Sequence, residues 1–182
     1  MTKDNVIILE SDKFITAIFR NPPDAEISYR NLLNIGYNKE NINLIMSDTV
    51  RKQNFSNSQE SEFYDMGNKS VEGLGIGAVA GGAIGGIAAA IAALGTALVF
   101  PVLGLTISGP LAAGLAGAGA GSTTGGLIGA LVGWGFPSEK AKILEEEVKN
   151  GGVAIVIKLD NEITRSLLLK NISTSNFQTE KI

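Results

Sequence analysis

The chain of 182 residues contains no cysteine and no histidine. The missing cysteine excludes a disulfide framework, a thiol nucleophile and a thiolate metal site. The missing histidine excludes Ser-His-Asp and Cys-His catalytic arrangements and the usual catalytic zinc shell. A net charge of −3 and a pI near 5.0 do not provide the basic face that nucleic acid requires. We therefore expect no enzyme, no catalytic residue, no metal, no cofactor and no nucleic-acid partner.

Charge is missing from one long stretch of the chain. The 15 basic and 18 acidic residues all lie outside Gly73–Ser138, a run of 66 residues that holds 19 of the 23 glycines. Charged residues at the N-terminus, such as Lys3 and Asp4, interrupt any apolar core of a signal peptide. The sequence thus combines two flanking segments of ordinary, water-soluble composition with a Gly/Ala-rich apolar insert. We expect it on the cytoplasmic side of the inner (plasma) membrane with the insert in the membrane, or alternatively in the cytoplasm.

The residues before the insert predict a strand, a helix and a second strand. The run 14–19 is rich in β-branched and aromatic residues and predicts a buried strand, after a short strand at 6–9. Asn21 followed by Pro22 and Pro23 predicts a helix start, and Gly36 predicts its end. The largely alternating run 42–46 predicts the next strand, parallel to 14–19. Residues 48–69 are polar and predict a surface loop.

The residues after the insert predict a helix, a strand and a short second helix. The helix begins at Pro137-Ser138, places Ala141, Leu144 and Val148 on one face and ends at Gly151. The strand covers 153–159 and the second helix 160–169, while the tail from 173 is expected to fray. Three consecutive glutamates, Glu145 to Glu147, point about 100° apart on a helix and predict a solvated face rather than one acidic site.

Neither flank is large enough to fold alone, so the two together predict one discontinuous α/β domain. We predict an α+β fold, a ferredoxin-like α/β sandwich interrupted by a long Gly/Ala-rich helical hairpin. The domain is formed by residues 1–48 and 138–172. Residues 49–72 form a polar loop, 73–137 the hairpin and 173–182 a tail.

Two prolines divide the insert into arms. The arms 73–100 and 111–136 predict helices of roughly 40 Å, enough to cross a hydrocarbon core of about 30 Å, with a turn at 101–110. Each glycine destabilises a helix by about 1 kcal/mol relative to alanine. The large number of glycines in these predicted helices therefore requires a physical reason. Their spacing of four residues predicts a glycine zipper, a smooth face for close helix packing. The predicted packing residues are Gly77, Gly81, Gly85, Gly117, Gly121, Gly125, Gly129 and Gly133.

Bulky residues lie opposite the glycines in both arms. Ile84, Ile87 and Ile91 mark this face in the first arm, and Leu127 and Leu131 mark it in the second. Such a face suits lipid or another apolar partner. A flexible linker lacks this stripe, and the match at Gly75–Ala80 to a dinucleotide loop lacks a preceding buried strand. The hydroxyls of residues 122–124 predict hydrogen bonds within the helix or to a neighbour, or alternatively the lining of a polar path in an oligomer.

The order of these segments resembles a bacterial family. The segment "ENINLIMSD", the glycine-zipper hairpin, a Glu/Lys-rich helix and "GGVAIVIKL" are similar to the general stress and low-temperature-induced proteins with a Gly-rich hydrophobic middle. The resemblance covers about residues 14–160. It implies a cytoplasm-facing α/β domain on a membrane-associated hairpin, linked to stress, with no established chemistry.

These features predict a non-enzymatic, membrane-associated protein that self-assembles into a homo-oligomer, with itself and the lipid bilayer as partners. Two alternatives remain open at this stage. One is a soluble homo-oligomer that buries the hairpin as a shared core. The other is a membrane-permeabilising protein in which several hairpins surround a pore.

Overall fold

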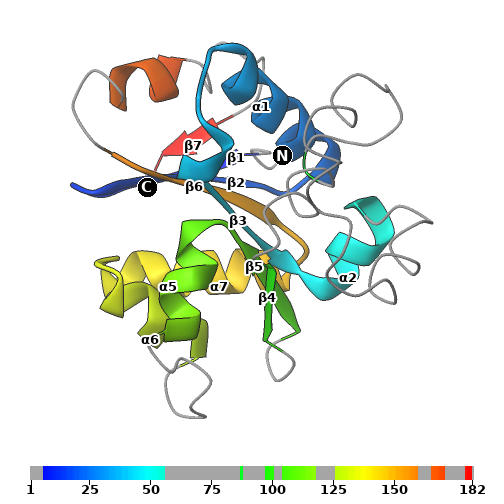
Figure 1. Cartoon of the computed structure of the whole chain (residues 1–182), viewed down its shortest axis with the longest axis vertical. Helices are drawn as coiled ribbons and strands as arrows, with labels where there is room; N and C mark the ends of the chain where they lie inside the picture. Colours follow the sequence, from blue (N-terminus) through cyan, green and yellow to red (C-terminus); the bar gives the residue numbers. More distant parts are fainter. Residues whose placement is uncertain are drawn as a thin grey trace, which may run out of the picture.

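The structure is a computed structural model, and it describes residues 6–55, 87, 97–100, 104–117, 126–159, 165–170 and 179–181. In these ranges one sheet lies between two helical layers (Figure 1). The strands are β1 (Val6–Glu10), β2 (Phe14–Phe19), β3 (Ile42–Ser47), β4 (Ala97–Phe100), β5 (Leu105–Ser108), β6 (Val153–Lys158) and β7 (Thr179–Lys181). The helices are α1 (Pro22–Asn34), η1 (Lys39–Asn41), α2 (Asp48–Val50), η2 (Arg51–Phe55), α5 (Pro110–Gly117), α6 (Gly126–Gly133) and α7 (Ser138–Lys149). A further helical segment covers residues 165–170.

The strand order is β4-β5-β3-β6-β2-β1-β7. Every neighbouring pair is antiparallel except β1 and β7, which are parallel. Because β2 and β3 both pair antiparallel with β6, they run parallel to each other on either side of it. This confirms the predicted direction of the strands that flank α1, and it shows that a later strand enters between them.

Both faces of the central strands are covered. All six residues of β2 are buried. Ile15, Ala17 and Phe19 pack in the core on the α1 side, while Phe14 and Ile18 pack in the core on the α7 side. A strand that is apolar at consecutive positions requires cover on both faces, and α1 provides one cover while α5, α6 and α7 provide the other (Figure 1).

The mixed α+β class is therefore correct, whereas the ferredoxin-like sandwich is not confirmed. That prediction places both main helices in one layer, but α1 and α7 lie on opposite faces of the sheet. Residues predicted to leave the domain also return to it. Strand β5 pairs with β3, and α5 and α6 cover the same sheet face as α7.

The two flanking helices lie where the sequence predicts them. In α1, Ala25, Tyr29 and Leu32 are buried, and the chain leaves the helix through Gly36 at φ +87°. In α7, the buried residues are the predicted Ala141, Leu144 and Val148. Asn21 precedes α1 as expected but forms no side-chain cap hydrogen bond, so Pro22 and Pro23 contribute the start signal.

Four sequence predictions are corrected by the structure. The end of the first arm is strand β4 rather than helix, and the predicted turn at 101–110 contains strand β5. The polar loop begins with helical turns, since Asp48–Val50 and Arg51–Phe55 are helical. The tail predicted to fray contains β7, which pairs with β1. In each case a partner strand or a local cap outweighs the composition of the segment.

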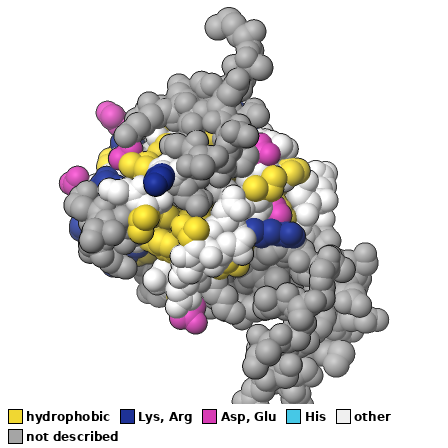
Figure 2. All heavy atoms as spheres, turned by 90° about the horizontal axis from the view of Figure 1, so that it is seen from above, with side chains coloured by type: hydrophobic (Ala, Val, Ile, Leu, Met, Phe, Trp, Pro, Cys, Tyr) yellow, Lys and Arg dark blue, Asp and Glu magenta, His cyan; other side chains and the backbone are white. Residues whose placement is uncertain are grey.

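The α1 side of the molecule carries hydrophobic side chains at its surface, interspersed with acidic and basic ones (Figure 2). Among the exposed large hydrophobic residues are Ile27 and Leu33 of α1, together with Ile35 and Leu167.

Candidate functional site: the surface between α6 and α7

Helix α6 is the part of the glycine-zipper pattern that the structure describes most fully. Its eight residues bury Leu127 and Leu131 completely against the α7 side of the sheet. Gly129 and Gly133 lie on the opposite, exposed side, where Val132 is 43 % exposed. The predicted division of this helix into a bulky and a smooth face is thus present. Its bulky face covers the chain's own sheet.

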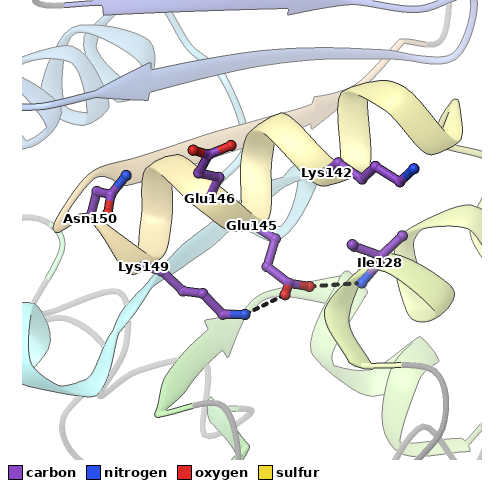
Figure 3. Close-up of a pocket in the computed structure, with 6 residues that line it drawn as sticks. All are labelled: Ile128, Lys142, Glu145, Glu146, Lys149 and Asn150. Carbon is purple, nitrogen blue, oxygen red and sulfur yellow. Dashed lines mark hydrogen bonds and ion pairs between the residues drawn. The ribbon is translucent and has the colours of Figure 1, made fainter.

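The start of α6 is capped by a carboxylate from α7. The backbone N–H of Ile128 donates to Oε2 of Glu145 at 3.2 Å, and Lys149 Nζ donates to Oε1 of the same carboxylate at 2.5 Å (Figure 3). An anionic group near the first turn of a helix satisfies an unpaired N–H and interacts favourably with the helix dipole. Glu145 thus forms an ion pair with Lys149 one turn along α7 and in addition joins α7 to the insert.

A shallow hollow of about 300 Å³ lies beside this cap. Two lysines and two glutamates lie at its rim, so it has no excess of either charge to select a charged ligand. The residues that line it are Ile128, Lys142, Glu145, Glu146, Lys149 and Asn150 (Figure 3). Glu145 is already occupied by Ile128 and Lys149, and the hollow offers no nucleophile next to a base.

The three consecutive glutamates separate as predicted. Glu145 reaches α6, Glu146 is exposed, and Glu147 accepts hydrogen bonds from Arg20 Nε at 3.0 Å and from Nη2 at 2.9 Å. The expectation of a uniformly solvated face is wrong for Glu145 and Glu147. Both carboxylates have partners far away in the sequence, which periodicity does not reveal.

The end of α6 is anchored by aromatic stacking. The ring centroids of Phe14 and Trp134 lie 4.6 Å apart, and those of Phe14 and Phe136 lie 4.8 Å apart. Offset stacking at these separations is favourable, and Phe136 is buried. Phe136 belongs to the core on the α7 side of the sheet, and Trp134 packs against it.

Sequence reasoning missed Asn43, which connects β3 to the insert. Its amide donates to the carbonyl of Val156 at 3.0 Å, and its Oδ1 accepts from the N–H of Leu111 at 2.7 Å. Asn43 is only 1 % exposed, so it is a buried cap for the first turn of α5. The one available signal was a polar residue inside an apolar strand.

The two arms of the insert contact opposite faces of the sheet. Ile87 is fully buried in the core on the α1 side, and its N–H donates to Oε2 of Glu26 at 2.9 Å. Leu127 and Leu131 are buried in the core on the α7 side. At these described positions the arms lie on different sides of the sheet, so the predicted long Gly/Ala-rich hairpin is not confirmed.

Of the eight predicted packing glycines, only Gly117, Gly129 and Gly133 lie among the described residues. At Gly129 and Gly133 an added Cβ meets no heavy atom within 4 Å, so these positions have no close neighbour in the part of the chain that the structure describes. Gly117 is the last residue of α5. The remaining ones, Gly77, Gly81, Gly85, Gly121 and Gly125, lie outside the described residues, as do the hydroxyl residues 122–124.

The described ranges contain no group of three acidic side chains that could hold a metal ion. Burial, with a smaller effect of the Glu26 carboxylate, raises the pKa of Tyr29 to about 12, so this phenol stays protonated. Within the same ranges no helix has the length and apolar character needed to cross a bilayer.

Comparison of the chain with models of protein families, with curated proteins and with solved structures finds no match.

Proposed function

We propose that this chain is a non-enzymatic, self-assembling protein that associates with the cytoplasmic side of a membrane through its charge-free segment. The resemblance described above adds a stress-related setting to this proposal. The observation that carries it is the orientation of α6. Its leucines pack inward, while Gly129, Gly133 and Val132 are presented at the surface within a segment of 66 residues without charge.

The geometry favours surface association over simple spanning by α6. Eight residues form a helix of about 12 Å, whereas the hydrocarbon core of a bilayer is about 30 Å thick. An exposed face of glycine and valine permits close approach of a second helix or of acyl chains.

The alternative of a soluble homo-oligomer is supported by a different observation. Leu127 and Leu131 are already buried within the chain, so this part of the segment is accommodated without lipid. In that case the exposed side of α6 contacts a second copy, and no bilayer is involved.

The test is flotation of the purified full chain with vesicles of phosphatidylcholine and phosphatidylglycerol, together with light scattering after size-exclusion chromatography without detergent. Membrane association predicts that most of the protein floats with the vesicles at both low and high salt. A defined oligomer that remains entirely in the lipid-free fraction contradicts the membrane proposal and favours the soluble oligomer.

A further inference from the structure

Three backbone N–H groups in the described part of the insert donate to side chains from outside it. The segment Gly73–Ser138 contains no Asp, Glu or Asn, although these residues are good acceptors for the free N–H groups at helix starts. The flanking sequence provides the acceptors. The N–H of Ile87 donates to Glu26, that of Leu111 to Asn43 and that of Ile128 to Glu145.

The caps of α5 and α6 differ in their access to water. Asn43 is buried, and its amide is also committed to Val156. Glu145 lies at the edge of the hollow between α6 and α7, and its carboxylate is shared with Lys149, whose side chain is 46 % exposed (Figure 3). A bond next to solvent, held by one oxygen at 3.2 Å, opens more easily than one enclosed in the core. The bond to Glu145 is therefore the weaker of these two attachments.

The two ends of α6 are held differently. The C-terminal end is followed by Gly135 at φ +102° and by Phe136, which stacks on Phe14. The N-terminal end begins at Gly126 with φ +50° and is attached through the Ile128–Glu145 bond and the buried leucines. Glycine tolerates a change of backbone torsion more readily than other residues, so Gly126 and Gly135 permit α6 to swing about its anchored end.

We propose that Glu145 is a latch that holds α6 against the domain, and that opening of this latch presents Leu127 and Leu131 to a bilayer. The inference rests on the membrane association proposed above. In water an open α6 exposes leucine, which favours the closed form. In contact with lipid the apolar surfaces remain in an apolar environment, so the closed form loses this advantage and the polar cap decides between the two.

The first test is amide hydrogen exchange of the full chain in the absence of lipid. Glu145→Ala removes the acceptor of Ile128 and should accelerate exchange of the amides in residues 127–131 on the order of 10-fold. Glu146→Ala is the matched control, because the neighbouring glutamate is exposed on the same helix. Lys149→Ala separates the lost ion pair from the lost cap. Equal exchange in Glu145→Ala and Glu146→Ala overturns the latch.

The second test uses vesicles of phosphatidylcholine and phosphatidylglycerol. Because the chain has no cysteine, Ile128→Cys with Lys142→Cys introduces a single pair of thiols at the rim of the same hollow. A short bis-maleimide should close α6 onto α7, and the same variant capped with N-ethylmaleimide is the open control. We expect the cross-linked protein to lose at least 10-fold in vesicle affinity and Glu145→Ala to gain several-fold.

The outcomes separate the two proposals. If the cross-linked and capped proteins bind vesicles equally, the latch is overturned while membrane association stands. If no form binds vesicles, the proposed membrane association is wrong, and the proposed opening of the latch toward a bilayer is wrong with it. The cross-linked comparison keeps Glu145 in place, so it remains informative even if Glu145→Ala does not fold.

Discussion

Gly109 and Gly129 belong to the same charge-free segment but have different structural roles. Gly109 has φ +96°, and a Cβ added there lies 2.6 Å from the carbonyl oxygen of Ile42. Gly129 lies in an exposed helical position with nothing within 4 Å. The first glycine is required by the turn between β5 and α5, whereas nothing in the described ranges requires a glycine at position 129.

We predict that Gly109→Ala lowers the free energy of unfolding by about 2–4 kcal/mol, because left-handed backbone strain and a contact with backbone add together. Gly129→Ala should raise it by about 0.5–1 kcal/mol, because alanine is the better helix former. Urea unfolding followed by circular dichroism measures both values. A loss of stability at Gly129 similar to that at Gly109 would show that α6 packs more closely than the structure has it.

Asp48 is the residue at which the structure predicts a pH dependence. Hydrogen bonds from the Lys52 ammonium and then from Arg51, opposed in part by desolvation, lower the pKa of its carboxyl below 3.8. Lys52 Nζ lies 2.7 Å from Oδ2, and Arg51 Nη2 lies 3.0 Å from Oδ1. Because the pKa is lower in the folded state, the stabilisation is present above the unfolded pKa and is lost as the pH falls through the folded one.

Urea unfolding of wild type and Asp48→Asn at pH 7 and at pH 3 checks this. The variant should be less stable than wild type at pH 7 by under about 1 kcal/mol, because the carboxylate is partly exposed to solvent. The difference between the two proteins should shrink at pH 3. A difference that grows as the pH falls would contradict the assigned direction.

At the scale of elements, substitutions on the two faces of α6 should have different effects on stability and assembly. Leu131→Ala removes a fully buried side chain and should cost about 2–5 kcal/mol of stability. Gly129→Leu adds a side chain into open space and should leave the stability of one chain unchanged or slightly higher. If the smooth face contacts a second copy, Gly129→Leu should instead lower the oligomer fraction.

Urea unfolding and light scattering together measure stability and assembly for these two variants. We expect Leu131→Ala to lower the free energy of unfolding without a specific loss of assembly. If the smooth face contacts a second copy, Gly129→Leu should lower the oligomer fraction without a loss of stability. Equal effects of both substitutions on both measurements would disprove the two-faced description of α6.

For the whole molecule, the structure makes the charge-free segment part of the fold. Strands β4 and β5 extend the sheet beyond β3, and α5 and α6 cover residues such as Ile45 and Val156 on its face. A deletion variant in which a short Gly/Ser linker replaces residues 97–137 uncovers this face. We expect this variant to lose its near-ultraviolet circular dichroism and to bind a hydrophobic dye, because seven of the 17 buried residues of the core on the α7 side are missing. A cooperative, fully folded variant would show instead that the rest of the chain folds without residues 97–137.

The sequence alone determined the local elements with strong periodicity or clear end signals. The helices at 22–34 and 138–149 and the strands at 14–19, 42–47 and 153–158 follow from apolar spacing, prolines and glycines near one another in the chain. The sequence also predicted that leucine and glycine lie on opposite faces of α6, because a helix has a fixed period.

Only the tertiary structure decided what these elements contact. Asn43, Glu145 and Glu147 find their partners 68, 17 and 127 residues away, and no local pattern specifies such pairs. Similarly, a short apolar run such as 97–100 suits a helix or a strand, and pairing with β5 selects the strand. The physical reason is the same throughout. Periodicity states that a face is apolar, but the surface that covers this face is chosen by the competition among all the apolar surfaces of the folded chain.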